Sequence, residues 1–218
     1  MGSVLPIDIS GCMVFPNHAT RYFLNINKFF ILFFLVFLFY IPSGKSQGEF
    51  NIWYFGSKAG VDFNPGYPVA LLNCSNFGGG AQTCISDSTG SLLFYTNGQM
   101  VINRQHQVMP NGINLYGGLF GNSRQCAFAI QSLSDDSLCY IFTSYGMNGG
   151  WFTYGLRYSL LDMRLDNGLG DIVSGQKNVV IPAGFDAAGT LTATRHANNR
   201  DAWVVSRKWG YGNPQLYV

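Results

Sequence analysis

A short unit occurs three times in this chain after residue 85, and it constrains the fold more than any other feature. Each copy is a polar turn that leads into a short apolar strand. The copies are 86–90 with 93–96, 132–137 with 140–143, and 198–201 with 203–206. The strands recur after 47 and then 63 residues, counted from Leu93 to Tyr140 to Trp203. Propeller blades with loop insertions fall in this range, so the spacing predicts a propeller-like architecture.

The composition indicates an all-β protein. Only 11% of the residues are charged, against about 25% in ordinary soluble domains, and the 27 glycines exceed the usual ~7%. Residues that build helix surfaces are scarce, whereas Tyr, Phe, Val, Thr, Gly and Asn suit pleated sheets and turns. The prediction is therefore an all-β fold built from antiparallel meanders.

Three stretches have the strand and turn pattern of a meander: 84–103, 126–163 and 191–218. The clearest hairpin signal is Asn97-Gly98 between the apolar runs 92–96 and 100–103. We expect a partial β-propeller of two to three meander blades. Because propellers close with about 4 to 8 blades, we also expect this chain to be a fragment of a longer protein.

The first part of the chain has the pattern of a secretory leader. Residues 29–41 are an uninterrupted apolar run after Lys28, too short for a comfortable membrane span of about 20 residues. The small-x-small pattern that follows predicts signal cleavage near Ser46 and Gln47. We expect a leader over 1–47 and an incomplete propeller-like domain over 48–218. An uncleaved signal anchor is the alternative; after Gln47 we expect no membrane span.

Charge and cysteine content exclude some partners and leave others open. After Gln47 the chain has ten basic and ten acidic residues without a basic cluster, so we expect no nucleic-acid binding. An exported chain permits disulfides among its four mature cysteines, which allow three pairings. For Cys126 and Cys139 the alternative, at least as well supported, is that they are small apolar side chains inside strands. Neither zinc nor another cofactor is predicted. The four mature cysteines are Cys74, Cys84, Cys126 and Cys139.

Several stretches resemble one family: the amino-terminal propeller-like repeat region of secreted, gliding-motility-associated surface proteins of gliding bacteria. Those proteins end in a type B sorting domain for type IX secretion. The likeness covers nearly all of the mature chain in the family's order. The matching stretches are 53–56 with 59–63, 85–87 with 90–98, Asn103, His106, 109–112, 155–159 with 162–163, 168–171, 191–193 with 196–198, and 203–205.

The resemblance implies a repeat domain exported to the cell surface or medium, with no assigned enzymatic activity. A sorting domain is missing from this sequence, so export by the type IX secretion machinery is implied only if the natural gene continues. The glycine loop 78–80 and Cys84 also depart from the family pattern.

Two groups of acidic residues could carry chemistry. The turn that begins at Asp87 resembles the aspartate turns of sialidase-type propellers, but its spacing is shifted, and an ordinary capped turn is favoured. Asp162, Asp166 and Asp171 could offer oxygens to calcium. They lack the alternating ligand spacing of a calcium loop, so we expect them to cap turns.

No residue is predicted to be catalytic. His106 and His196 lie beside turn residues without a nucleophile motif, so a structural role is favoured for both. Glu49 is the only glutamate, so a glycosidase would need paired aspartates.

Aromatic residues in glycine-rich loops could stack on sugars or pack on other proteins, and covering the sheet ends is an equal alternative. We expect a non-enzymatic secreted or outer-surface protein for adhesion, gliding or surface assembly that binds surface glycans or proteins. The rivals are a secreted carbohydrate-active enzyme completed by missing blades and an architectural spacer. The loop aromatics are Tyr116, Phe120, Tyr145, Trp151, Phe152, Tyr154, Trp209 and Tyr211.

Overall fold

The computed structural model describes residues 48–75, 82–117, 125–144, 155–182, 187–198, 200–208 and 216–217. These residues all belong to one compact unit, Ser46–Val218. The predicted leader, its apolar run 29–41, and the cleavage residues Ser46 and Gln47 lie outside the described residues. Within the part described, no helix has both the length and the apolar character needed to cross a membrane.

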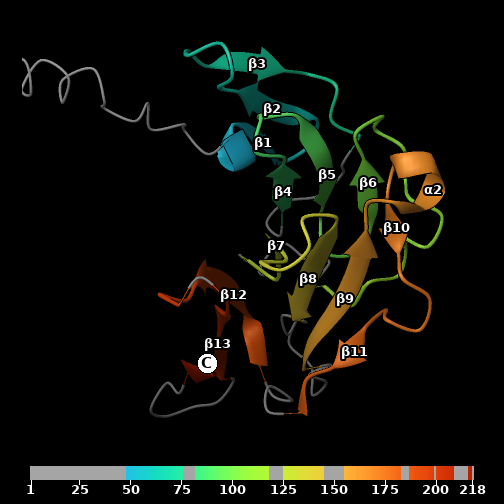
Figure 1. Ribbon diagram of the computed structural model, residues 1–218, viewed down its shortest axis with the longest axis vertical. Helices are drawn as coiled ribbons and strands as arrows, with labels where there is room; N and C mark the ends of the chain where they lie inside the picture. Colours follow the sequence, from blue (N-terminus) through green and yellow to red (C-terminus); the bar gives the residue numbers. More distant parts are fainter. Residues whose placement is uncertain are drawn as a thin grey trace, which may run out of the picture. The chain divides into compact units, whose positions relative to one another are not determined.

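The fold is all-β, as predicted, and its strands form four antiparallel sheets (Figure 1). The first sheet follows a short 3-10 turn, η1 (Gly48–Phe50), and contains β1 (Ile52–Phe55), β2 (Ala59–Asp62) and β3 (Val69–Leu71). The second contains β4 (Thr83–Ser86), β5 (Leu92–Thr96) and β6 (Val101–Asn103).

The third sheet is the widest. It contains β7 (Ala127–Gln131), β8 (Leu138–Ser144) and β9 (Leu156–Asp162), and two short strands, β10 (Asp171–Ile172) and β11 (Val179–Val180), pair with β9 one after the other. The fourth sheet contains β12 (Ala187–Arg195), β13 (Ala202–Lys208) and β14 (Leu216–Tyr217).

The predicted meanders are confirmed as strand sets, and the structure adds one sheet to them. The three predicted meanders begin at residue 84 and do not include a sheet before it, whereas β1 and β2 pair with β3 in a sheet of their own. Strands of only three or four residues give too short an alternation to show where one sheet ends. Among the described residues the sheets do not close into a ring, and the propeller stays a prediction.

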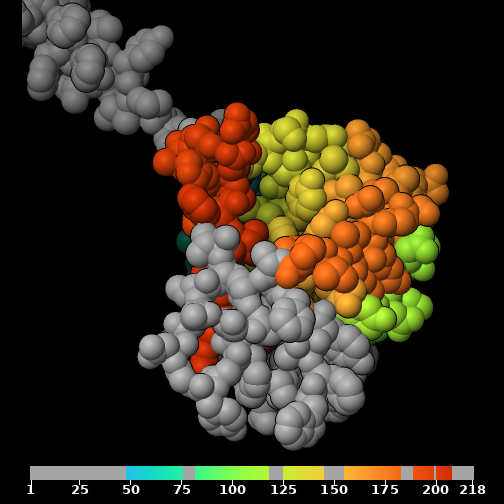
Figure 2. Space-filling view, turned by 90° about the horizontal axis from the view of Figure 1, so that it is seen from below, coloured from blue at the N-terminus to red at the C-terminus, as the bar shows by residue number. Residues whose placement is uncertain are grey.

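The sheets pack face to face in chain order through apolar side chains. Tyr54 in the first sheet and Cys74, in the segment that follows β3, pack on Tyr95 and Ile102 of the second sheet. The second and third sheets enclose the largest cluster, and the third and fourth meet around Leu156 and Leu191. Figure 2 shows the fourth sheet, in red, beside the yellow strands of the third. The largest cluster contains Ile85, Phe94, Val101, Met109, Leu115, Ala129, Cys139, Ile141, Leu161, Met163 and Ile172.

The first strands of successive sheets lie beside one another: β1 contacts β4, β4 contacts β7, and β7 contacts β12. Each of these strands forms a ladder within its sheet on one side only, with the second strand of the same sheet. A parallel bridge between Gln125, just before β7, and Thr190 in β12 joins these two strands. Four strand edges therefore face a common space, and this space is the candidate site.

Candidate functional site

Two adjoining cavities, of about 450 and 270 Å³, lie along the first strands of the four sheets. We call them together the inner-strand groove. They share part of their lining and are therefore continuous. The shared residues are Phe50, Ile85, Phe128 and Ala129.

An ion pair lies at one end of the inner-strand groove. Arg195, the last residue of β12, places a guanidinium nitrogen 3.4 Å from a carboxylate oxygen of Glu49 in η1. The position of Glu49 depends on its neighbour Gly48, because a side chain at Gly48 would overlap the backbone of Thr89 and Gly90. Because Gly48 and Gly90 approach closely, η1 lies against the second sheet, and Glu49 reaches Arg195 of the fourth sheet.

Aromatic rings form much of the groove wall near β1. The indole N–H of Trp53 donates a 2.7 Å hydrogen bond to the carbonyl of Phe50, and its ring meets Phe63 edge to face with centroids 5.3 Å apart. Phe50 itself is 62% exposed. A fixed indole beside an exposed phenyl ring gives a preorganised surface for a ligand with an apolar face.

His106 belongs to a different, partly buried polar cluster between the first two sheets. The side-chain amide nitrogen of Asn73 lies 2.7 Å from Nε2 of His106, and the hydroxyl of Tyr95 lies 3.2 Å from its Nδ1. Because the amide nitrogen can only donate, Nε2 accepts and Nδ1 carries the proton. The hydroxyl of Tyr54 donates to the side-chain amide oxygen, Oδ1, of Asn73 at 3.0 Å.

The ionisation of this cluster follows from its burial. Desolvation lowers the pKa of His106, and it raises the pKa of Tyr95 and brings that of Tyr54 to about 12. All three side chains are therefore neutral near pH 7. His106 lies in a tight turn with a φ of 62°, and its ring is within hydrogen-bonding distance of Asn73 and Tyr95. The structural role favoured from the sequence stays a prediction.

Three turns share one capping pattern, and they belong to the units found in the sequence. Asp87 accepts a hydrogen bond from the N–H of Thr89, Asp135 from that of Ser137, and Asn198 from that of Arg200, each at 2.8 to 3.0 Å. In each turn the acceptor bonds the residue two positions ahead, the geometry of an Asx turn. His196 accepts from the N–H of Asn198 in the third turn and packs on Trp203.

The carboxylates of the first two turns are stabilised in the ionised state. Burial opposes ionisation of Asp87, but donors from Thr89 and Ser91 outweigh it and hold the pKa below its usual value. The hydroxyl and N–H of Ser137 likewise lower the pKa of Asp135. An ordinary capped turn accounts for these contacts, as the sequence favoured.

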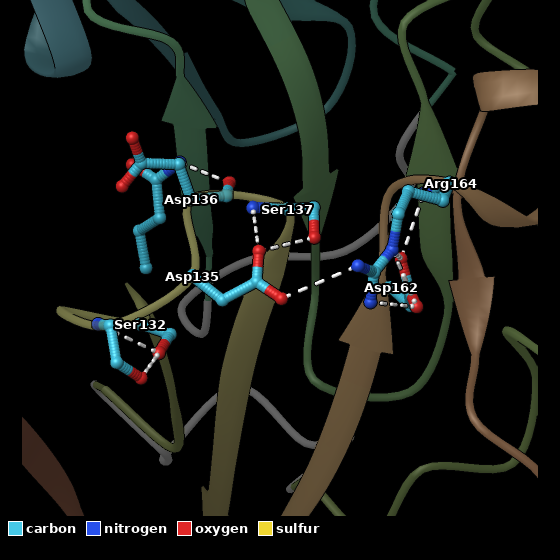
Figure 3. Close-up of polar contacts among 8 residues, drawn as sticks. Ser132, Asp135, Asp136, Ser137, Asp162 and Arg164 are labelled. Atoms are coloured by element: carbon cyan, nitrogen blue, oxygen red, sulfur yellow. Dashed lines mark hydrogen bonds and ion pairs between the residues drawn. The ribbon is translucent and has the colours of Figure 1, made fainter.

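The candidate calcium residues do not come together in one site. Asp162 holds the guanidinium of Arg164, which also lies 3.4 Å from Asp135 (Figure 3). Asp166 lies in the short turn α2 (Leu165–Gly168) with a φ of 48°, and Asp171 is bonded to Asn111. The described residues contain no group of three His, Cys, Asp or Glu that could hold a metal ion.

The remaining candidates are placed only in part. Tyr116 is exposed, and the guanidinium of Arg157 covers its ring at 4.9 Å, a cation–π contact on the protein surface. Cys74, Cys84, Cys126 and Cys139 are thiols in the structure. The other loop aromatics lie outside the described residues: Phe120, Tyr145, Trp151, Phe152, Tyr154, Trp209 and Tyr211.

The sequence missed the inner-strand groove. The sequence alone presents Glu49 as a lone carboxylate and does not relate it to Arg195, because 146 residues separate the two. The signal available was a single glutamate just before the first strand and an arginine that ends the strand at 191–195.

Neither a family model, a curated protein nor a solved structure matches this chain.

Proposed function

We propose that this is an exported, non-enzymatic protein that binds a surface glycan in the inner-strand groove, in the service of adhesion, gliding or surface assembly. The observation that carries the proposal is the ion pair of Glu49 and Arg195 at the end of a groove walled by Phe50, Trp53 and Phe128. A concave apolar site with a few convergent polar groups is the usual form of a ligand site.

A glycan fits this combination of groups. The C–H face of a sugar ring packs on an aromatic ring, and its hydroxyls bond a carboxylate and a guanidinium in the same plane. The side chain of Glu49 is 17% exposed and that of Arg195 is 45% exposed, so both can reach a ligand from the solvent side. Because the two charges cancel, a neutral glycan suits the groove better than a strongly charged one.

The surroundings of Glu49 support binding rather than hydrolysis. Most glycosidases use two carboxyl groups that flank the scissile bond. Glu49 is the only acidic residue in the described lining of the groove, and it faces a guanidinium. A carboxylate in this position is well suited to accept hydrogen bonds from hydroxyl groups.

The cellular setting comes from the sequence. The apolar run 29–41 with its cleavage pattern supports export, and the resemblance to type IX-exported, gliding-associated proteins supports a place on the outer cell surface. A glycan-binding protein on the outer cell surface could serve in adhesion, gliding or surface assembly.

The proposal is tested by a glycan array on the full chain, followed by affinity measurements on variants. We expect Phe50→Ala to abolish binding and Glu49→Gln to weaken it at least tenfold. Tyr67→Ala, at a ring that is 65% exposed and outside the groove lining, is the matched control and should bind as wild type. If the full chain binds no glycan on the array, the proposal is wrong. Turnover of a polymer that Glu49→Gln abolishes would establish the enzyme instead.

A further inference from the structure

The inner-strand groove continues past the end of β7 into a third cavity, of about 280 Å³. This cavity is lined by residues of β7 and β8 in the third sheet and of β13 in the fourth, and we call it the β7-end cavity. It shares Ile130 and Gln131, the last two residues of β7, with the 270 Å³ part of the groove. A ligand too long for the inner-strand groove can therefore extend into the β7-end cavity.

Two aromatic rings on β8 line the β7-end cavity. The rings of Tyr140 and Phe142 are nearly parallel, with centroids 6.3 Å apart and an interplanar angle of 22°. Both side chains are half-buried, and because they alternate along the strand they lie on one face of the third sheet. Two adjoining rings of this kind give a surface on which the C–H faces of sugar units can pack.

Polar groups from two turns complete the lining. Ser132 and Ser134, in the turn after β7, have their hydroxyl oxygens 3.1 Å apart. Arg200, in the turn before β13, has an 82% exposed side chain and lies 3.2 Å from a carboxylate oxygen of Asp201. Asp201 engages Nε and one terminal nitrogen of the guanidinium. Within the part of the chain that the structure describes, the other terminal nitrogen makes no hydrogen bond, so its N–H groups can serve a ligand.

The β7-end cavity repeats the chemistry of the inner-strand groove. Each combines an aromatic wall with an arginine whose charge is balanced by a carboxylate, Glu49 for Arg195 and Asp201 for Arg200. The two arginines belong to one hairpin, in which Arg195 pairs with Ala202, itself part of the β7-end lining. Two sites of like chemistry in succession along one path suit a ligand made of like units.

We propose that the glycan is a linear, neutral oligosaccharide whose units occupy both the inner-strand groove and the β7-end cavity. This inference rests on the proposed function and names the class of its ligand. Ligand sites usually measure about 300–1,000 Å³, so each of the three cavities holds about one or two sugar units, and the whole path about four to six. An acidic polymer gains little from arginines that are already paired.

The test is calorimetric titration of the full chain with cello-, manno- and xylo-oligosaccharides of two and six units. We expect the six-unit member of at least one series to bind about a hundredfold more tightly than its two-unit member. Arg200→Gln should weaken binding of the six-unit member about tenfold and leave that of the two-unit member unchanged, because two units fit within the inner-strand groove. Arg207→Gln is the matched control, at an exposed arginine of β13 outside all three cavity linings, and should bind as wild type.

A second variant tests the aromatic wall. Tyr140→Leu keeps an apolar side chain but removes one stacking ring, and it should also weaken only the six-unit binding; circular dichroism checks its fold. If two and six units bind equally, or if either folded variant binds six units as tightly as wild type, the inference is wrong. It is also wrong if no member of the three series binds, whereas the proposed function is wrong only if the whole glycan array gives no ligand.

Discussion

Asn111 donates two hydrogen bonds to the carboxylate of Asp171, one from its backbone N–H at 2.8 Å and one from its side-chain amide at 2.7 Å. Asp171 is 7% exposed and accepts a third bond from the N–H of Ile172. The pair joins the loop after β6 to β10, and so connects the second sheet to the third at their outer strands.

Asp171→Asn should destabilise the protein. The new amide nitrogen would face a donor from Asn111, and a hydrogen bond to a buried charged group contributes about 1.5–3 kcal/mol. We expect the free energy of urea unfolding to fall by about 2 kcal/mol. Asp166→Asn is the control, because asparagine tolerates the positive φ at that position, and it should change stability by less than about 0.5 kcal/mol. Equal losses in both variants would refute the role given to this pair.

Gly90→Ala should cost more than Gly66→Ala. Both glycines have positive φ, 91° and 83°, so both substitutions carry a backbone cost of about 1–2 kcal/mol. A side chain at Gly90 would also overlap the Asn64 amide, whereas nothing lies within 4 Å of one at Gly66. We expect an additional loss of about 1–3 kcal/mol for Gly90→Ala in thermal or urea unfolding. Similar losses would show that the neighbouring Asn64 moves aside.

His106 should make stability fall in mild acid. Burial lowers its pKa, and Asn73 donates to the ring nitrogen that protonation would occupy. Its contribution is complete above the unfolded value of about 6.5 and is lost as the pH falls through the lower folded pKa. Unfolding at pH 7.5 and pH 5 should show a smaller change for His106→Gln than for wild type. An NMR titration of the His106 ring with a midpoint at or above 6.5 would contradict this.

Cys126 and Cys139 should not form a disulfide. Cys126 lies opposite Ser144 at one end of the β7–β8 hairpin, and Cys139 pairs with Gln131. The two cysteines are thus about 16 Å apart along the ladder, at ~3.3 Å per residue. A disulfide needs Cα atoms within about 7 Å. Non-reducing peptide mapping should find no such bridge.

The Cys139 thiol should also be unreactive in the folded protein. Burial raises its pKa to about 12, so almost no thiolate is present at neutral pH. Iodoacetamide should label it only after denaturation. If iodoacetamide labels Cys139 in the folded protein as fast as it labels an exposed thiol, the third sheet opens readily.

The sequence predicted what depends on local pattern. The Asn97-Gly98 hairpin, the capping role of Asp87 and the strands around 140 and 203 follow from turn chemistry and alternation within a few residues. These preferences act between neighbours in the chain, so they can be read without knowing the fold.

What the sequence did not predict depends on distant contacts. Glu49 meets Arg195, and Asn111 meets Asp171, only because the sheets stack. The separate first sheet was missed for the same reason: the exposed Trp53 and the buried Tyr54 differ in which neighbour covers them, and short strands give little periodicity to show it.

The stacking of sheets in chain order also bears on how the molecule comes apart. The second and third sheets are each covered on two sides, while the first is covered on one. Amide protons of β1 to β3 therefore exchange with solvent through partial opening, long before those of β5 and β8, and the centre of the stack is the last region to lose its protection.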